Sequence, residues 1–177
     1  SSRAFNDHLN KSSKNIIIEI NKSISEKLDN LINYDHLNIH INFYNTDSIN
    51  HIKKLEGFKI NELIMNEGPN LGKMDSYKFY ENLNFSNFIC MTKLKIENCN
   101  IGSLIESNLN LFSNLKNLKE LEFAHMHSLK SINCNLFDGL TQLENFKLIN
   151  TGVEVIEEKL FKNLKNLKNL NISFHNS

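Results

Sequence analysis

This chain lacks the features that mark several common protein classes. It has no tryptophan, one proline and six glycines among 177 residues, and no apolar run long enough to span a bilayer. The charges of its 20 basic and 20 acidic side chains cancel, which gives a formal net charge of zero at pH 7. Nucleic-acid binding needs a cationic surface, so this balance argues against it. The 40% hydrophobic content argues against a disordered chain.

Cysteine is also scarce, and no catalytic or metal-binding motif is present. An odd number of cysteines leaves at least one thiol unpaired within the chain, although Cys90 and Cys134 could pair. We expect Cys99 to be buried. His36 and His40, with His51 downstream, could hold a metal on a helix, but their segment alternates as a strand. We therefore predict no enzyme activity, no metal site and no cofactor.

Asparagine, in contrast, is abundant at about thirty residues. The excess could reflect a low-complexity tract, an asparagine ladder in a repeat fold, or compositional drift. Glycosylation sequons of the form N-x-[ST] occur at Asn10, Asn21, Asn84 and Asn171.

The C-terminal half carries an internal repeat with the pattern L-x-x-L-x-L-x-x-N/C-x-L. Units start near Met91, Leu118, Leu143 and Leu167, and the segments LFSNL, LFDGL and LFKNL recur between them. This is the spacing of leucine-rich repeats. It predicts one short parallel strand per unit, with alternate side chains buried between stacked units. The Phe of each LF segment should pack inside the opposite, convex side.

Residues 1–90 are predicted to form an N-terminal cap with irregular first repeats, and residues 91–177 to form the regular repeats. Strands are expected over 16–20 and 37–43 and around Ile60, Leu63 and Met65, with a short helix after the first. The fold class is thus α/β, a leucine-rich-repeat solenoid with a curved parallel sheet, a short-helical convex side and a β-rich cap. The repeats stop without a capping unit, so we expect the natural chain to continue.

The position that normally holds the ladder asparagine carries Cys99, Met126, Thr151 and His175 instead. We therefore interpret the asparagine excess as drift at positions that packing hardly constrains. The remaining strand positions should face outward and form the candidate binding surface. They carry mixed charge and amides, as suits a folded protein partner; a solvated face without a partner is the alternative. These candidate residues are Lys93, Lys95, Glu97, Asn98, Lys119, Glu120, Glu122, His125, Glu144, Asn145, Lys147, Asn150, Lys168, Asn169, Asn171 and Phe174.

The LF-containing repeats, preceded by the segment with Pro69 and Tyr80 to Leu83, resemble the N-terminal part of arthropod Toll and Toll-like receptor ectodomains. The resemblance covers roughly residues 55–177. It implies an extracellular module that binds a cystine-knot cytokine in innate immune or developmental signalling, within a full-length protein that crosses the membrane once. The cap cysteines of that family are missing before Cys90. The alternative is a secreted or intracellular leucine-rich-repeat scaffold without a signalling tail.

Overall fold

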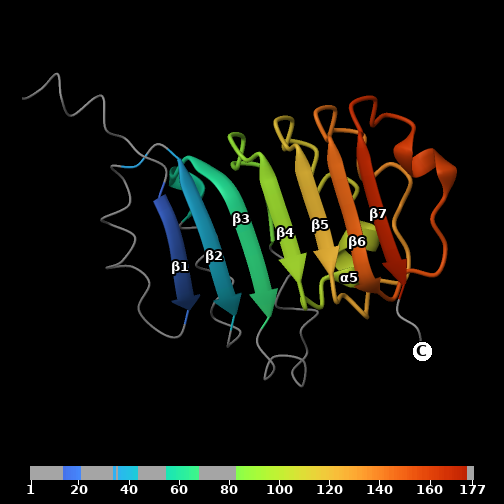
Figure 1. Cartoon of the computed structure of the whole chain (residues 1–177), viewed down its shortest axis with the longest axis horizontal. Coiled ribbons are helices and arrows are strands. Elements are labelled where there is room, and N and C mark those ends of the chain that lie inside the picture. The colour runs from blue at the N-terminus through green and yellow to red at the C-terminus, as the bar shows by residue number, and fades with distance from the viewer. Residues whose placement is uncertain (1–13, 21–33, 35, 44–54, 68–82, 175–177) are drawn as a thin grey trace, which may run out of the picture.

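The protein is a parallel β-solenoid with one strand in each coil. The computed structural model describes residues 14–20, 34, 36–43, 55–67 and 83–174. All seven strands lie in one sheet, pair in parallel and follow one another in sequence order (Figure 1). They are β1 (Lys14–Ile20), β2 (Leu37–Phe43), β3 (Ile60–Glu67), β4 (Lys93–Glu97), β5 (Glu120–Ala124), β6 (Asn145–Thr151) and β7 (Asn169–Phe174).

The return segments between the strands contain little helix in the described part of the chain. The helices there are η2 (Leu55–Gly57), α5 (Gly102–Ser107) and η4 (Glu158–Phe161). A parallel strand needs a crossover to reach its neighbour, and here that crossover is a short, mostly irregular segment closed by tight turns. The predicted repeat solenoid with a parallel sheet is therefore confirmed.

Every strand expected from the sequence is present, in the cap region as well as in the repeats. The sheet continues from β3 into β4 through five register pairs, so no break in the sheet marks residue 90. Some predictions lie outside the described residues: the helix after β1, the turn at Pro69, and the ends of the chain that include Asn10 and His175.

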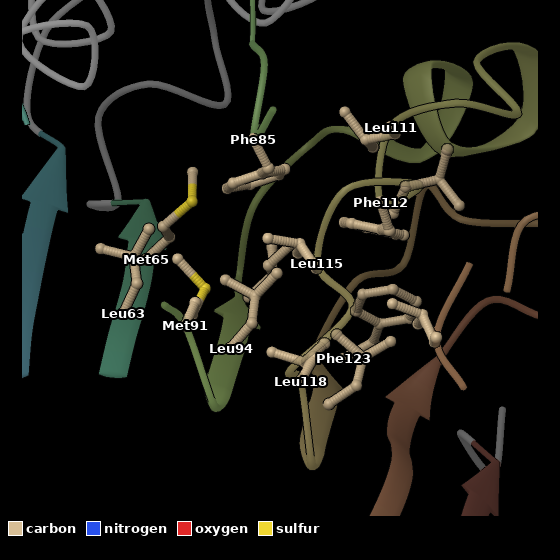
Figure 2. Close-up of a cluster of buried hydrophobic side chains, with 14 of the residues drawn as sticks. Leu63, Met65, Phe85, Met91, Leu94, Leu111, Phe112, Leu115, Leu118 and Phe123 are labelled. Atoms are coloured by element: carbon tan, nitrogen blue, oxygen red, sulfur yellow. The ribbon is translucent and has the colours of Figure 1, made fainter. Parts of the chain in front are cut away.

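The inward row of each strand forms the core, as the alternation predicted. Leu94 and Ile96 of β4, Phe123 of β5 and Phe146 and Leu148 of β6 are at most 1% exposed. Each is covered by the same row of the adjoining coils, which is why a single coil could not bury it alone. Figure 2 shows Leu94 of β4 and Phe123 of β5 in one cluster with Leu115 of a return segment.

Phenylalanines from the return segments run through the interior and join the coils. Phe85 stacks on Phe112 with ring centroids 5.7 Å apart, and Phe112 contacts Phe123 at 6.0 Å (Figure 2). Phe137 meets Phe146 edge-on at 5.1 Å. Phe112 and Phe137 belong to the recurrent LF segments, so the prediction that these rings pack inside the convex side is confirmed.

A residue in the left-handed region lies directly after β4 and β5 and one residue before the end of β6. Asn98, His125 and Asn150 have φ of 54°, 54° and 51°. Asparagine and histidine tolerate this conformation better than most residues, which explains their recurrence at one place in the repeat. The turn that they make directs the following residue of each coil back into the interior: Cys99 and Thr151, for example, are 1% and 2% exposed.

The interpretation of the asparagines as unconstrained drift is wrong for many of them. On the outward side, Asn61 donates to Asn38, Asn66 donates to Asn42, and Asn98 donates to Asn66. A primary amide has both a donor and an acceptor, so one asparagine can donate to a side chain on one side and accept from a side chain on the other. At the turns, the side chains of Asn117 and Asn166 donate to backbone carbonyls of the preceding coil at 2.8 and 2.7 Å.

The three cysteines form no disulfide with one another. Cys90 is exposed, Cys134 is partly buried, and they do not pair, which corrects the disulfide considered from the sequence. Cys99 is buried as expected, with its sulfur 3.2 Å from the carbonyl oxygen of Glu97.

Candidate functional site

The candidate site is the outward face, defined here as the side of β2 to β7 that points away from the core. Because the strands pair in parallel and in register, side chains at corresponding positions form rows that cross the sheet. The first row contains Glu62, Lys93, Glu120, Asn145 and Asn169. The second contains Ile64, Lys95, Glu122, Lys147 and Asn171.

Charge alternates from strand to strand along these rows. In the first row, Lys93 Nζ lies 3.1 Å from Glu62 and 3.9 Å from Glu120. In the second row, Glu122 lies 3.2 Å from Lys95 on one side and 3.3 Å from Lys147 on the other. The face therefore carries paired charges of both signs and no field of a single sign.

Lys95 and Glu122 are the most strongly coupled pair of the face. Partial burial alone would lower the pKa of Lys95, but its hydrogen bonds to Glu97 and Glu122 outweigh burial and raise it. Burial would raise the pKa of Glu122, yet Lys95 and then Lys147 outweigh that effect and lower it. Both groups therefore stay charged over a wider pH range than the free side chains, and the network persists at neutral pH.

A second set of polar contacts lies where the strands begin. Lys168 Nζ is 2.7 Å from a carboxylate oxygen of Glu144, and this bond lowers the pKa of that carboxyl. The carbonyl of Lys119 accepts bonds from the backbone N–H groups of Glu144 and Asn145. Such backbone hydrogen bonds between successive coils set the register in which each strand pairs with the preceding one.

At the opposite ends of the strands, amides and a histidine form the margin of the face. His125 Nδ1 lies 2.9 Å from Asn150 Nδ2, so the imidazole accepts from the amide in one tautomer. Asn98 is exposed and bonds to Asn66, as described above. These side chains extend from the left-handed turns and leave part of their hydrogen-bonding capacity open to a partner.

Of the candidates, Lys119, Glu144 and Lys168 lie just before their strands and Asn98 and His125 just after theirs, while those within the strands lie on the outward face with one exception. Phe174 was assigned to the outward face by analogy with Asn150. In β7, however, Phe174 pairs with the buried Thr151, and no left-handed residue interrupts the strand. Strict alternation then places Phe174 in the inward row with Leu170 and Ile172. We correct its assignment accordingly.

The sequence analysis missed the part of the face that lies on β2 and β3. Glu62 completes the first charged row, and Asn38, Asn42, Asn61 and Asn66 form the amide network. The signal was available, because 37–43 and 60–67 alternate as strands and their polar positions therefore share the outward side. These segments do not match the repeat pattern, and for that reason their polar residues were not selected.

A small hollow lies between the charged rows of the outward face. It has a volume of about 10 Å³, which is room for roughly one water molecule, and lies among Lys93, Glu120, Glu122, Asn145 and Lys147. Within the described ranges, no three His, Cys, Asp or Glu side chains are grouped as metal ligands would be. His36 is exposed and His40 is partly buried on β2, while His51 lies outside those ranges.

The two sequons within the described residues are both at exposed positions. Asn84 lies before β4, where its Oδ1 accepts the backbone N–H of Ser86 at 2.7 Å. Asn171 projects from β7 in the second row. Asn10 and Asn21 lie outside the described residues. Among the helices that the structure describes, none has the length and apolar content needed to cross a membrane.

Neither a scan against protein-family models nor a search of curated proteins finds a match to this chain.

Proposed function

We propose that this chain is a leucine-rich-repeat module that binds another protein through the outward face of β3 to β6. The leucine-rich-repeat assignment is supported by the agreement between the pattern L-x-x-L-x-L and the buried positions in the coils that begin at Met91, Leu118 and Leu143. It is further supported by the phenylalanines that recur in the return segments. The ladder position departs from the family pattern, since Cys99, Met126 and Thr151 occupy it.

The observation that carries the binding proposal is the ordered alternation of charge on rigid strands. Lys95 of β4 and Lys147 of β6 hold Glu122 of β5 between them, so these side chains are positioned before a partner arrives. Positioned charges discriminate between partners, because the wrong pattern places like charges together. A nucleic-acid partner would require an excess of positive charge, but on this face the lysines are balanced by glutamates.

The finer proposal is that the module belongs to a cell-surface receptor ectodomain of the Toll-like type and recognises an extracellular cytokine. The resemblance in 55–177 and the exposed sequon at Asn84 support it. A scaffold without a signalling tail is the second candidate. The free thiols of Cys90, which is exposed, and Cys134, which is partly buried, favour it, because accessible free thiols are more typical of reducing compartments.

Inverting the charges of the second row tests the binding proposal while keeping the pairing between its strands, although the Lys95–Glu97 contact within β4 is lost. The triple variant Lys95→Glu, Glu122→Lys, Lys147→Glu keeps opposite charges on adjacent strands but reverses their order. Immobilised wild-type and variant chains would be exposed to extract from the native source, and the retained proteins quantified. We expect proteins held by the wild-type chain to be lost from the variant by tenfold or more.

The matched control carries the same types of substitution on the return segment: Glu158→Lys, Lys162→Glu and Lys165→Glu, all at exposed positions. This control should retain the partner at the wild-type level. Equal retention by both triple variants would refute the outward face as the binding surface. Circular dichroism of each variant verifies that the fold is intact.

The compartment is tested separately through Asn84. In protein from its native source, the receptor proposal predicts an N-linked glycan at this position, detected as a mass decrease after enzymatic deglycosylation that is absent from Asn84→Gln. An unmodified Asn84 in that protein would favour the scaffold.

A further inference from the structure

The first row of the outward face holds more negative than positive charge. Its charged members are Glu62, Lys93 and Glu120, so two carboxylates share one ammonium group. Lys93 Nζ lies 3.1 Å from Glu62 but 3.9 Å from Glu120, so the shorter contact is with Glu62. On the other side of Glu120 the row continues with Asn145, which is neutral. Glu120 is therefore the less compensated carboxylate of this row.

The second row, in contrast, is balanced. Glu122 lies between Lys95 and Lys147, at 3.2 and 3.3 Å, and Lys95 also contacts Glu97 at 3.0 Å. Two lysines thus neutralise two glutamates. The side chain of Glu122 is 21% exposed, whereas that of Glu120 is 47% exposed. The carboxylate with the weaker pairing is also the one that a partner can reach more easily.

The lysines that precede the strands belong to a different set of contacts. Lys168 and, to a smaller extent, Lys119 lower the pKa of the Glu144 carboxyl, so both act on that group. Within the described part of the chain, the ion pair of Glu120 is with Lys93. The first row therefore has room for one further cation beside Glu120.

Glu120 borders the small hollow of the outward face, together with Asn145. The hollow has a volume of about 10 Å³, which suits a group of the size of one water molecule. The ammonium group of lysine is compact and has three donors, whereas the guanidinium of arginine is a larger planar fork. Asn145 Oδ1 accepts from Asn169 and keeps a second lone pair, so it can accept from an ammonium group as well.

We propose that this hollow binds the ammonium group of a lysine on the surface of the protein partner, with Glu120 as its counter-ion. The inference rests on the proposed function and specifies the chemistry of the partner. The incoming lysine supplies the cation that the first row lacks, while Lys93 stays paired with Glu62. A partner that presents a carboxylate here would place it against Glu120, and the repulsion would exclude that partner.

The first test uses the isolated chain with small probes. The probes are Nα-acetyl-lysine methylamide, its arginine counterpart and the neutral norleucine counterpart, and backbone amide NMR shifts at low salt follow their binding. The lysine probe should shift the signals of Glu120 and Asn145, and the norleucine probe should not. An exposed ion pair changes an affinity by at most about fivefold, so we expect the lysine probe to bind roughly threefold more tightly than the arginine probe.

Two substitutions should change the affinity for the lysine probe in opposite directions. Glu120→Gln removes the counter-ion with little change of shape and should weaken binding by about threefold, whereas Lys93→Gln removes the competing cation and should strengthen binding by about twofold. The matched controls are Glu158→Gln and Lys162→Gln, at exposed positions of the return segment. They change the net charge by the same amounts and should bind the probe like the wild-type chain.

The second test looks for the lysine of the partner itself. A carbodiimide activates a carboxylate, and an amine in contact with it then forms an amide bond as the urea leaves; a guanidinium is not joined in this way. In extract from the native source, the wild-type chain should give a link between Glu120 and a lysine of a second protein, identified by mass spectrometry. Glu158→Gln should keep this link and Glu120→Gln should lose it. The internal link between Glu62 and Lys93 verifies that the reaction proceeded.

The outcomes separate this inference from the binding proposal. If the triple variant of the second row loses the retained proteins but no link forms at Glu120, the lysine site is wrong and the outward face stands. If the triple variant retains them like the wild-type chain, both proposals fail. Tighter binding of the arginine probe, or weaker binding of the lysine probe by Lys93→Gln, would overturn the lysine site on the isolated chain.

Discussion

Replacing Phe137 with alanine gives the sharpest stability test of the coil-on-coil packing. The ring is 1% exposed, and its centroid lies 6.4 Å from that of Phe123 and 5.1 Å from that of Phe146. It therefore joins its own return segment to the strands of two coils. Truncating a fully buried phenylalanine typically costs about 3–5 kcal/mol, and loss of the edge-on aromatic contact adds to the cavity.

Phe161 provides the matched comparison, because it occupies the same position in the next coil but is only partly buried. For Phe161→Ala we expect a loss of roughly 1–2 kcal/mol, since less apolar surface leaves the core and a smaller cavity forms. The two phenylalanines occupy the same position within the repeat and receive the same substitution. The difference between the two losses of stability therefore measures the contribution of the coil that covers Phe137.

Urea unfolding followed by far-ultraviolet circular dichroism measures both variants, since the chain has no tryptophan for fluorescence. A Phe137→Ala loss at least twice that of Phe161→Ala is the expected result. Equal losses of stability at the two positions would refute the reasoning. A loss below about 1 kcal/mol at Phe137 would also refute it, because removing a ring from a continuous core leaves a cavity that destabilises the fold by more than this.

Three further predictions use the same unfolding assay. Folding lowers the pKa of Glu122, so its stabilising contribution is fully present above the ordinary glutamate pKa and is lost as the pH falls through the lowered pKa of the folded state; Glu122→Gln should cost about 1 kcal/mol near pH 7 and progressively less as the pH falls below the ordinary glutamate pKa, and a cost that does not change with pH would contradict the ion-pair account. Gly152→Ala would place a Cβ 2.3 Å from the carbonyl oxygen of His127 and should cost about 1–3 kcal/mol, whereas Gly57→Ala, with nothing within 4 Å, should be close to neutral. Asn66→Ala removes one bond to each neighbouring strand and should cost about 1 kcal/mol; an unchanged midpoint would show that the amide network does not stabilise the sheet.

Strand positions and inward rows were predictable from the sequence because they depend on local alternation. Segments such as Leu37–Phe43 and Lys93–Glu97 place apolar residues at every second position, and burial of one face fixes their register. The repeat length then implied that successive strands lie side by side. The position of Phe137 inside the convex side followed from its recurrence in each unit.

The contacts between coils were harder to predict, because they depend on which side chains become neighbours across the sheet. Asn42 and Asn66 are 24 residues apart and bond only because β2 and β3 pair in register. Phe174 was misassigned because the left-handed turn at Asn150 does not recur in β7, and a single such residue determines to which side the next side chain points. Charge alternation from strand to strand likewise becomes visible only once the register is known.

The central functional claim concerns which side of the solenoid a partner touches, and site-directed photo-cross-linking measures this directly. A photoreactive amino acid would replace Lys147 in the second outward row or, in a separate chain, Lys162 on the return segment; both positions are exposed. After irradiation in the native source, the account predicts a covalent adduct of a discrete additional protein from position 147 and none from position 162. Adducts from 162 alone would contradict it and assign binding to the convex side.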